Sequence, residues 1–246
     1  MHLLEERGTL DQVVDLATHW FERHHDLKDI MNRHLFRDRR DAGRQLAQKL
    51  GYLEQSHPLV LALPRGGVPV GIEVASALHA PLDLLLVRKI GVPGHSELAA
   101  GAVIDGARPR TVINEDVVRM AHVSRSDIAK IVEAELANIE RRRCLWLSDR
   151  PHVPIAGHSA IVVDDGIATG ASARVALQAV RADGAARVIL AMPVAPAETA
   201  EMLRAECDEV VCLATPEDFM AVGVYYEDFH QIGDREVQEL LQRAPI

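Results

Sequence analysis

The chain has 246 residues, of which 48% are hydrophobic and 26% are charged, and this balance excludes an intrinsically disordered or collagen-like protein. Its 27 basic and 36 acidic residues give a net charge of −9. Proteins that bind nucleic acid or anionic membranes usually carry a basic surplus, so we expect neither partner.

The sequence predicts a cytoplasmic protein. Its apolar runs are far shorter than the about 20 residues that a membrane-spanning helix needs. The first residues, MHLLEERGTL, lack the apolar stretch of a signal peptide. The three cysteines form no CxxC pattern and are too few for a disulfide framework, which is typical of a reducing compartment.

Residues 1–34 are predicted to form a helical extension, separate from a domain that covers 35–246. Thr9 is a plausible N-cap, and apolar residues recur after it at helical spacing. Several histidines lie here, but His19 is five and six residues away from His24 and His25. Two metal ligands on one helix face are three or four residues apart, so we do not expect a metal site here.

Strand-like and helix-like patterns alternate from residue 36 onward. The expected strands are 58–63, 81–87, 100–105, 110–114, 159–165, 186–192 and 208–214, and the expected helices are 36–50, 68–78, 124–146, 170–184, 198–206 and 234–243. The strands at 100–105 and 110–114 are candidates for a hairpin. The alternation predicts an α/β fold, an open, mostly parallel twisted sheet with helices on both faces.

Two helices carry further signals. In the helix at 36–50, the arginines are most simply interpreted as a solvent-exposed face, with a role near an anionic ligand as the alternative; they are Arg37, Arg39, Arg40 and Arg44. In the helix at 124–146, Ser124 and Asp127 match a capping box, which marks where a helix begins.

The segment IVVDDGIATGASARVAL, at 161–177, carries the clearest chemical signal. A strand ends in Asp164 and Asp165, and a helix begins after a loop of small and hydroxyl-bearing residues: Gly166, Ile167, Ala168, Thr169, Gly170, Ala171 and Ser172. Small residues let backbone N–H groups approach a phosphate, and the helix N-terminus favours an anion. Adjacent carboxylates suit the two vicinal hydroxyls of a ribose. The segment lacks the lysine of a P-loop, which excludes that motif. The small-residue loop and the two carboxylates together predict a cradle for a ribose phosphate.

The motif VVDDGIATGAS resembles the phosphoribosyl-pyrophosphate signature of the type I phosphoribosyltransferases. Further pieces resemble a less characterised branch of that superfamily: FRDRRDAGRQLA, LALPRGGVPVG, VRKIGVPGHSELAAGAV and PEDFMAVGVYYEDF. The resemblance covers roughly residues 36–243, and it implies a type I phosphoribosyltransferase-like fold with a small hood over the site.

The resemblance also implies a role for each matching residue. Asp164 and Asp165 would hold the ribose hydroxyls, and 166–172 would hold the 5′-phosphate. In the PRGG motif, Arg65, Gly66 and Gly67 would form the pyrophosphate loop, where related enzymes often have a non-proline cis peptide. Arg88 and Lys89 would face the pyrophosphate, and the stretch 91–100 would be a mobile loop that closes over the site.

These pieces also agree with a general rule of α/β folds. The PRGG motif, Arg88-Lys89 and the segment after Asp164 all follow the carboxyl ends of predicted strands. Ligands of open α/β sheets bind at that edge, so the three pieces are expected to face one site.

The candidate residues for binding the acceptor lie in the predicted hood. Phe219, Tyr225 and Tyr226 are candidates to stack on an aromatic acceptor, with packing of the hood as the alternative. The candidates for proton transfer are Lys89 and Glu97, with His95 beside the latter. Members of the family that use 6-oxopurines often carry an acid where this chain has Ala168, which weakens the case for such a substrate.

The resemblance implies a phosphoribosyltransferase that transfers ribose 5-phosphate from 5-phosphoribosyl 1-pyrophosphate to an unidentified, nitrogenous small-molecule acceptor. Mg²⁺ is the expected cofactor, held mainly by the substrate rather than by direct protein ligands. A homodimer is common in such proteins. Two alternatives stay open: a non-catalytic regulator or sensor that binds phosphoribosyl pyrophosphate, and a phosphorylase or hydrolase of a ribose phosphate.

Overall fold

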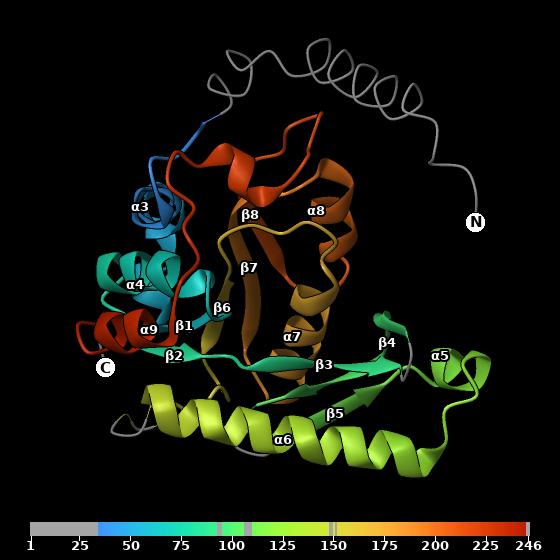
Figure 1. Ribbon diagram of the computed structural model, residues 1–246. Helices are drawn as coiled ribbons and strands as arrows, with labels where there is room; N and C mark the ends of the chain where they lie inside the picture. The colour runs from blue at the N-terminus through green and yellow to red at the C-terminus, as the bar shows by residue number, and fades with distance from the viewer. Residues whose placement is uncertain (1–33, 93–94, 106–109, 148–149, 151, 245–246) are drawn as a thin grey trace, which may run out of the picture.

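The computed structural model describes residues 34–92, 95–105, 110–147, 150 and 152–244, with 95–99 and 110 described by their backbone alone (Figure 1). The helical extension expected for residues 1–34 therefore lies outside the described residues, apart from His34. The division into 1–34 and 35–246 stays a prediction.

A five-stranded parallel sheet forms the centre of the molecule. Its strands are β1 (Pro58–Ala62), β2 (Leu82–Leu84), β6 (Ser159–Val163), β7 (Arg187–Val194) and β8 (Glu209–Ala214). They lie in the order β2-β1-β6-β7-β8, and each neighbouring pair is parallel. The predicted fold class is confirmed.

Helices cover both faces of this sheet. On one face lie α3 (Arg39–Leu50), α4 (Gly67–Ala77) and α9 (Asp234–Leu241); on the other lie α7 (Ala171–Ala182) and α8 (Ala197–Leu203) (Figure 1). Successive side chains of a strand point to opposite faces. Val60 and Ile161 therefore join the core on the first face, while Leu61 and Val162 join the core on the second. Burial on both sides explains the unbroken apolar runs of the sequence.

A second, three-stranded sheet corrects two expectations. It is antiparallel, with β3 (Val87–Val92), β4 (His95–Ile104) and β5 (Arg110–Ile113) in that order. The expected strand at 81–87 is two strands, because β2 ends at Leu84 and β3 starts in the other sheet. The loop expected at 91–100 is mostly the arms of the β3–β4 hairpin, in which Gly91 pairs with Ala99 and Val92 pairs with His95. The hairpin expected from 100–105 and 110–114 is confirmed as β4 and β5.

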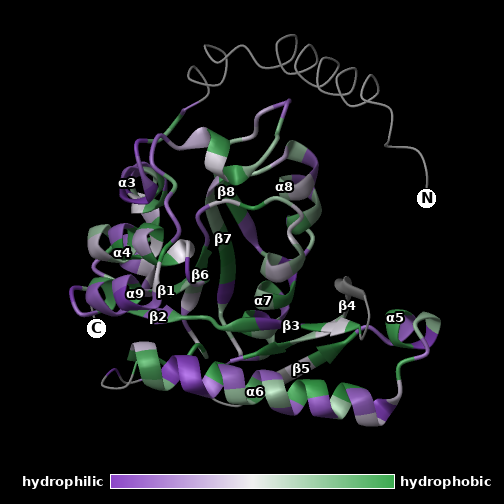
Figure 2. Ribbon diagram, viewed as in Figure 1, coloured by the Kyte–Doolittle hydropathy of each residue, from purple (hydrophilic) through white to green (hydrophobic). Residues whose placement is uncertain are grey.

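The long helix α6 (Arg125–Leu147) lies along the second sheet, after the short helix α5 (Glu115–Met120) (Figure 1). It begins as the capping box predicts: the Asp127 N–H donates to Ser124 Oγ at 3.1 Å. Ile139 and Trp146 on α6 are buried in the same core as Ile90 of β3. Figure 2 shows hydrophilic and hydrophobic residues alternating along α6, as expected for a helix with one buried side.

The hood lies beyond β8. It contains a short 3₁₀ helix, η2 (Val222–Tyr225), and it pairs with the chain just before α3, where the Phe36 N–H donates to the Tyr225 carbonyl at 3.1 Å. Another 3₁₀ helix, η1 (Gly51–Ser56), follows α3. Among the described residues, no helix is both long enough and apolar enough to cross a membrane.

Candidate functional site

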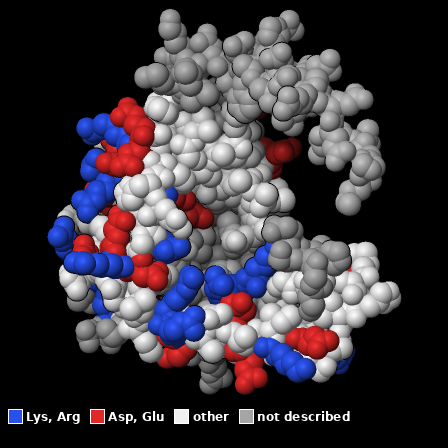
Figure 3. Space-filling model, viewed as in Figure 1, with Lys and Arg blue, Asp and Glu red and all other residues white. Residues whose placement is uncertain are grey.

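The expected site elements meet at one cavity of about 150 Å³, beside the carboxyl ends of β1 and β6. Its lining residues are Leu63, Pro64, Leu85, Leu86, Val87, Arg88, Arg142, Asp164 and Ser172. The acid after β6, the first residue of the PRGG motif, the arginine of β3 and the hydroxyl at the start of α7 thus face a common space. Figure 3 shows basic side chains gathered beside a hollow in this face of the molecule.

Asp164 and Asp165 have different surroundings. Asp164 lines the cavity, and its Oδ1 accepts the Asp165 N–H at 2.9 Å. Desolvation by the surrounding protein, followed by the charge of Asp165, raises the pKa of the Asp164 carboxyl well above its usual value. A cation or hydroxyl donors from a ligand would relieve this, because both stabilise the ionised carboxylate.

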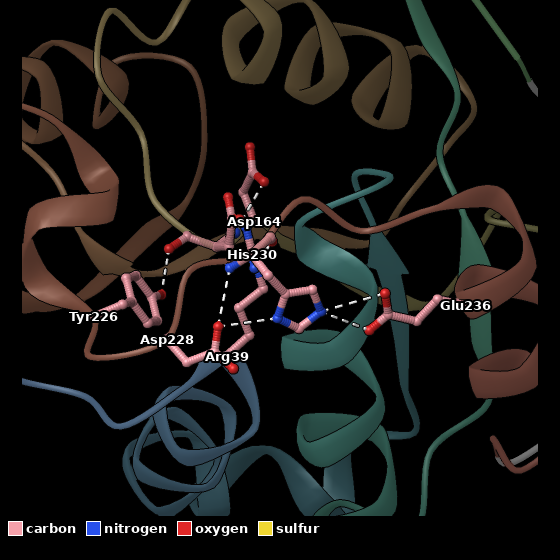
Figure 4. A network of polar contacts seen from close by, with 7 residues as sticks. Arg39, Asp164, Tyr226, Asp228, His230 and Glu236 are labelled. Atoms are coloured by element: carbon pink, nitrogen blue, oxygen red, sulfur yellow. Dashed lines mark hydrogen bonds and ion pairs between the residues drawn. The ribbon is translucent and has the colours of Figure 1, made fainter.

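Asp165 is held from behind by a buried arginine. Arg39 Nε donates to Asp165 Oδ2 at 2.7 Å, and its Nη1 donates to the His230 carbonyl at 2.9 Å (Figure 4). The two side chains are only 8% and 14% exposed. The Arg39 guanidinium also lies 3.8 Å from the centre of the Phe229 ring. The interpretation of Arg39 as part of a solvent-exposed face is therefore wrong.

The loop after Asp165 has the geometry of an anion cradle. Gly166 and Gly170 adopt φ of 155° and 74°, which L-residues with side chains rarely accept. Gly170 is the N-cap of α7, and the first N–H groups of a helix have no acceptor within it. The loop is braced from α8, where buried Thr199 donates from Oγ1 to the Ala168 carbonyl at 2.9 Å.

Thr169, Ala171 and Ser172 are exposed at this loop, and Ile167 is buried beneath it. An exposed hydroxyl can donate to a bound anion, whereas the buried isoleucine fixes the loop to the core. The expected 5′-phosphate role of 166–172 fits this arrangement and stays a prediction.

The PRGG motif lies against the acid pair. The peptide bond between Pro64 and Arg65 is cis, as the resemblance implies. A Cβ at Gly66 would lie 2.1 Å from Asp165 Oδ2, so only glycine leaves room for that carboxylate. Gly67 begins α4, and Arg65 Nη1 lies 3.7 Å from Asp234 Oδ1 at the start of α9.

The two cations of β3 are separated by the pleat. Arg88 lines the cavity, and its Nε donates to Glu135 Oε2 of α6 at 2.8 Å. Lys89 is the next residue of the strand, so its exposed side chain points to the opposite face, and it is not among the residues described as lining the cavity. Arg88 thus lies at the cavity, and the expected roles of Arg88 and Lys89 toward a pyrophosphate stay predictions. The backbones of Glu97 and His95 belong to β4, and their side chains lie outside the described part.

The hood aromatics expected at an acceptor are mostly core residues. Tyr225 and Tyr226 are each 2% exposed and pack with Phe36, whose ring centre lies 5.2 Å from that of Tyr226. The Tyr226 hydroxyl donates to the Asp165 carbonyl at 2.5 Å, which ties the hood to the acid pair. Neither tyrosine offers a ring face to a ligand, so packing is their observed role. Phe219 is partly exposed and stacks on Tyr225 at 5.7 Å between ring centres.

Sequence reasoning missed three residues that the structure brings to the site: Arg39, Arg142 and Thr199. Arg39 lies three, seven and eleven positions before the buried Ala42, Leu46 and Leu50, so helical periodicity could have placed it on the buried face. For Arg142 and Thr199, no local pattern distinguishes them from neighbouring arginines and hydroxyls.

Comparisons with known proteins agree with this geometry. The family described as "Phosphoribosyl transferase domain" matches residues 37–230. Two Mycobacterium tuberculosis proteins, from strains H37Rv and CDC 1551, are named "Putative phosphoribosyl transferase" and are each 49% identical over 211 residues, or 85% of this chain. The match covers 47% of each of them, so the chain spans about half the length of these curated relatives.

A solved structure is also similar to this chain in both sequence and fold. The crystal structure of TT1426 from Thermus thermophilus is 42% identical in sequence and superposes with a TM-score of 0.70. The likeness covers 84% of this chain and 97% of that chain. With the family match over most of the described residues and this likeness to TT1426, the chain belongs to the phosphoribosyl transferase domain family.

Proposed function

We propose that the protein is an enzyme that uses 5-phosphoribosyl 1-pyrophosphate and Mg²⁺ to transfer ribose 5-phosphate to a nitrogenous small molecule. The observation that carries the proposal is the shared cavity. Asp164 and the N-terminus of α7, both from the segment 161–177, converge there with the cis Pro64–Arg65 peptide of a distant segment. Their chemistry suits a ribose that carries a phosphate at one end and a pyrophosphate at the other.

Each group would meet the part of the substrate that its chemistry suits. The carboxylates of Asp164 and Asp165 would accept hydrogen bonds from the ribose hydroxyls, and the loop 166–172 would donate to the 5′-phosphate. Arg65 and Arg88 would face the pyrophosphate. The bond from ribose C1 to the pyrophosphate oxygen breaks, the bond from C1 to the acceptor nitrogen forms, and the acceptor loses a proton.

Charge stabilisation is the main task of the protein in this reaction. The leaving pyrophosphate gains charge as the C1–O bond breaks, and fixed guanidinium groups stabilise that charge in the transition state. Mg²⁺, when bound, would neutralise further charge on the pyrophosphate. The carboxylate of Asp164 would offer such an ion one oxygen ligand in the cavity, and we expect oxygens of the substrate to supply most of the others.

Ala168 is the one residue from which we infer something about the chemical identity of the acceptor. It is exposed in the loop after Asp165 and presents a methyl group where 6-oxopurine enzymes often have an acid. We therefore place the acceptor outside the 6-oxopurines.

The test is release of pyrophosphate from phosphoribosyl pyrophosphate and Mg²⁺, with a panel of nitrogenous acceptors. Asp164→Asn should lower the rate at least about tenfold, since one lost charge-assisted hydrogen bond is worth about 1.5–3 kcal/mol. The Asn Oδ1 can still accept the Asp165 N–H, so the variant should fold. Asp116→Asn, on the surface of α5, is the matched control and should behave as wild type.

The outcomes separate the alternatives. Pyrophosphate release that requires an acceptor supports the transferase. Release without any acceptor indicates a hydrolase. Tight binding of phosphoribosyl pyrophosphate with no release under any condition indicates a sensor.

A further inference from the structure

Three consecutive arginines of α6, Arg141 to Arg143, have different surroundings. Arg141 is exposed and donates to Asn138 Oδ1 of its own helix at 2.6 Å. Arg143 pairs with Asp105, which is only 4% exposed. Arg142 lines the cavity that also contains Asp164. Among these three arginines, Arg142 is thus the one described at the candidate site.

Helical geometry brings Arg142 to the same side of α6 as the partner of Arg88. Glu135, Asn138 and Arg142 are spaced by three and four residues and therefore share one face of the helix. Glu135 Oε2 accepts from Arg88 Nε at 2.8 Å and from Asn138 Nδ2 at 3.3 Å. The helix thus fixes Arg88 with one residue and adds a second guanidinium two turns later.

The Arg142 side chain is positioned by its neighbours, and no counter-ion faces it among the described residues. Its guanidinium carbon lies 5.3 Å from the centre of the Trp146 ring, and Trp146 is 4% exposed. No carboxylate of the described residues lies within 4 Å of it, whereas Arg88 has Glu135 and Arg65 has Asp234. Desolvation, followed by the charge of Arg88, lowers the pKa of Arg142, and Asp234 acts in the opposite direction. An anion in the cavity would remove this unfavourable crowding of charge.

We propose that Arg142 is a further binding residue for the pyrophosphate group, and that it forms with Arg88 a two-arginine clamp between β3 and α6. This inference rests on the proposed function, which supplies the anion. The 5′-phosphate has its own cradle at the start of α7. Arg88 and Arg142 are the two cationic residues described as lining the cavity, which favours an anion of higher charge beside them.

The geometry of guanidinium suits this role. Its planar N–H groups bind two phosphate oxygens at once, and stacking on a ring limits the freedom that binding must remove. Glu135 partly neutralises the charge of Arg88, and Asp234 partly neutralises that of Arg65. Arg142 would therefore supply positive charge that balances the negative charge of the pyrophosphate.

The experiment is calorimetric titration of the full chain with inorganic pyrophosphate and, separately, with ribose 5-phosphate, at fixed Mg²⁺. Arg142→Met keeps an unbranched chain over Trp146 and removes the charge. It should weaken pyrophosphate binding about 10- to 100-fold, as expected for one or two charge-assisted hydrogen bonds, and leave ribose 5-phosphate within about threefold. Arg142→Lys should recover part of the loss. Arg141→Met is the matched control and should bind both ligands as wild type.

Two results would overturn the role of Arg142. One is pyrophosphate affinity of Arg142→Met equal to that of wild type. The other is an equal loss for both ligands with a lowered melting temperature, which would mean that the residue acts through the fold.

The wild-type protein separates the two proposals. If it binds pyrophosphate in an Arg142-dependent way but transfers ribose 5-phosphate to no acceptor, the proposed function fails and the clamp stands. If it transfers ribose 5-phosphate while Arg142→Met binds pyrophosphate normally, only the clamp fails. Wild type that binds no pyrophosphate at all overturns the clamp.

Discussion

At the scale of single residues, the site depends on an ion pair that also stabilises the fold. Arg39 comes from the first described helix and Asp165 from the loop after β6, and both are largely buried. Burying two charges is costly, so such a pair is favourable only when its remaining hydrogen bonds are satisfied. Here the His230 carbonyl takes a second bond of Arg39, and Phe229 covers the guanidinium.

Removing one partner of this ion pair should destabilise the fold. Arg39→Met leaves Asp165 buried without its partner and should lower the free energy of unfolding by about 3–5 kcal/mol. Urea unfolding followed by circular dichroism measures the loss. The double variant Arg39→Met with Asp165→Asn should recover part of it, because neither buried charge then remains. A single variant as stable as wild type would show that the ion pair contributes nothing to the fold.

At the scale of elements, the connection between the hood and α9 carries a titratable contact. His230 lies between two carboxylates, with Nδ1 at 3.0 Å from Asp228 Oδ1 and Nε2 at 3.1 Å from Glu236 Oε1 of α9 (Figure 4). Its hydrogen bonds, first to Glu236 and then to Asp228, raise the pKa of His230 above its usual value. When the imidazole is protonated, its contacts therefore connect Asp228 with Glu236 in the first turn of α9.

A pH dependence follows. Because the folded-state pKa is raised, this stabilisation is fully present below the unfolded-state pKa of about 6.5 and is lost as pH rises through the higher folded-state pKa. The urea midpoint of wild type should exceed that of His230→Gln at pH 5.5, and the gap should shrink by pH 8. A gap that stays constant or widens over this range would contradict the assignment. The side chain is 55% exposed, so the effect should be modest and weaker in high salt.

At the scale of the whole molecule, the residues that line the cavity come from the parallel sheet with its loops and from the unit formed by the second sheet and α6. Figure 1 shows these two units next to each other. The parallel sheet supplies Asp164 and the PRGG motif. The second unit supplies Arg88 and Arg142. The binding of a ligand that spans both sides therefore depends on how the two units pack, through contacts such as those of α6 with α9.

The residues described as lining this cavity lie between Leu63 and Ser172, and the family match begins at residue 37. Deletion of residues 1–30 should therefore leave a folded protein whose affinity for phosphoribosyl pyrophosphate is within a few-fold of that of the full chain. Calorimetry on both proteins measures it. A truncated protein that is folded but no longer binds would place residues 1–30 in the site and contradict the division at 34/35.

The sequence by itself determined the features that depend on neighbours along the chain. Unbroken apolar runs identified the buried strands, and spacing identified the helices, because both patterns repeat over a few residues. The acid pair and the glycine loop were recognisable for the same reason: their chemistry lies within 161–177.

Only the tertiary structure decided what depends on distant partners. Gly101 in β4 shows this, since a Cβ there would lie 2.1 Å from the Val112 carbonyl oxygen of β5, a constraint that no local pattern expresses. Arg39 looks like its exposed neighbours until Asp165, 126 positions away, gives it a partner. In sequence, Arg142 looks like its neighbours Arg141 and Arg143, and only the folded structure gives it different surroundings, at the cavity. A charge is stable in a protein interior only where other segments supply its partners, and that supply is fixed when the chain has folded.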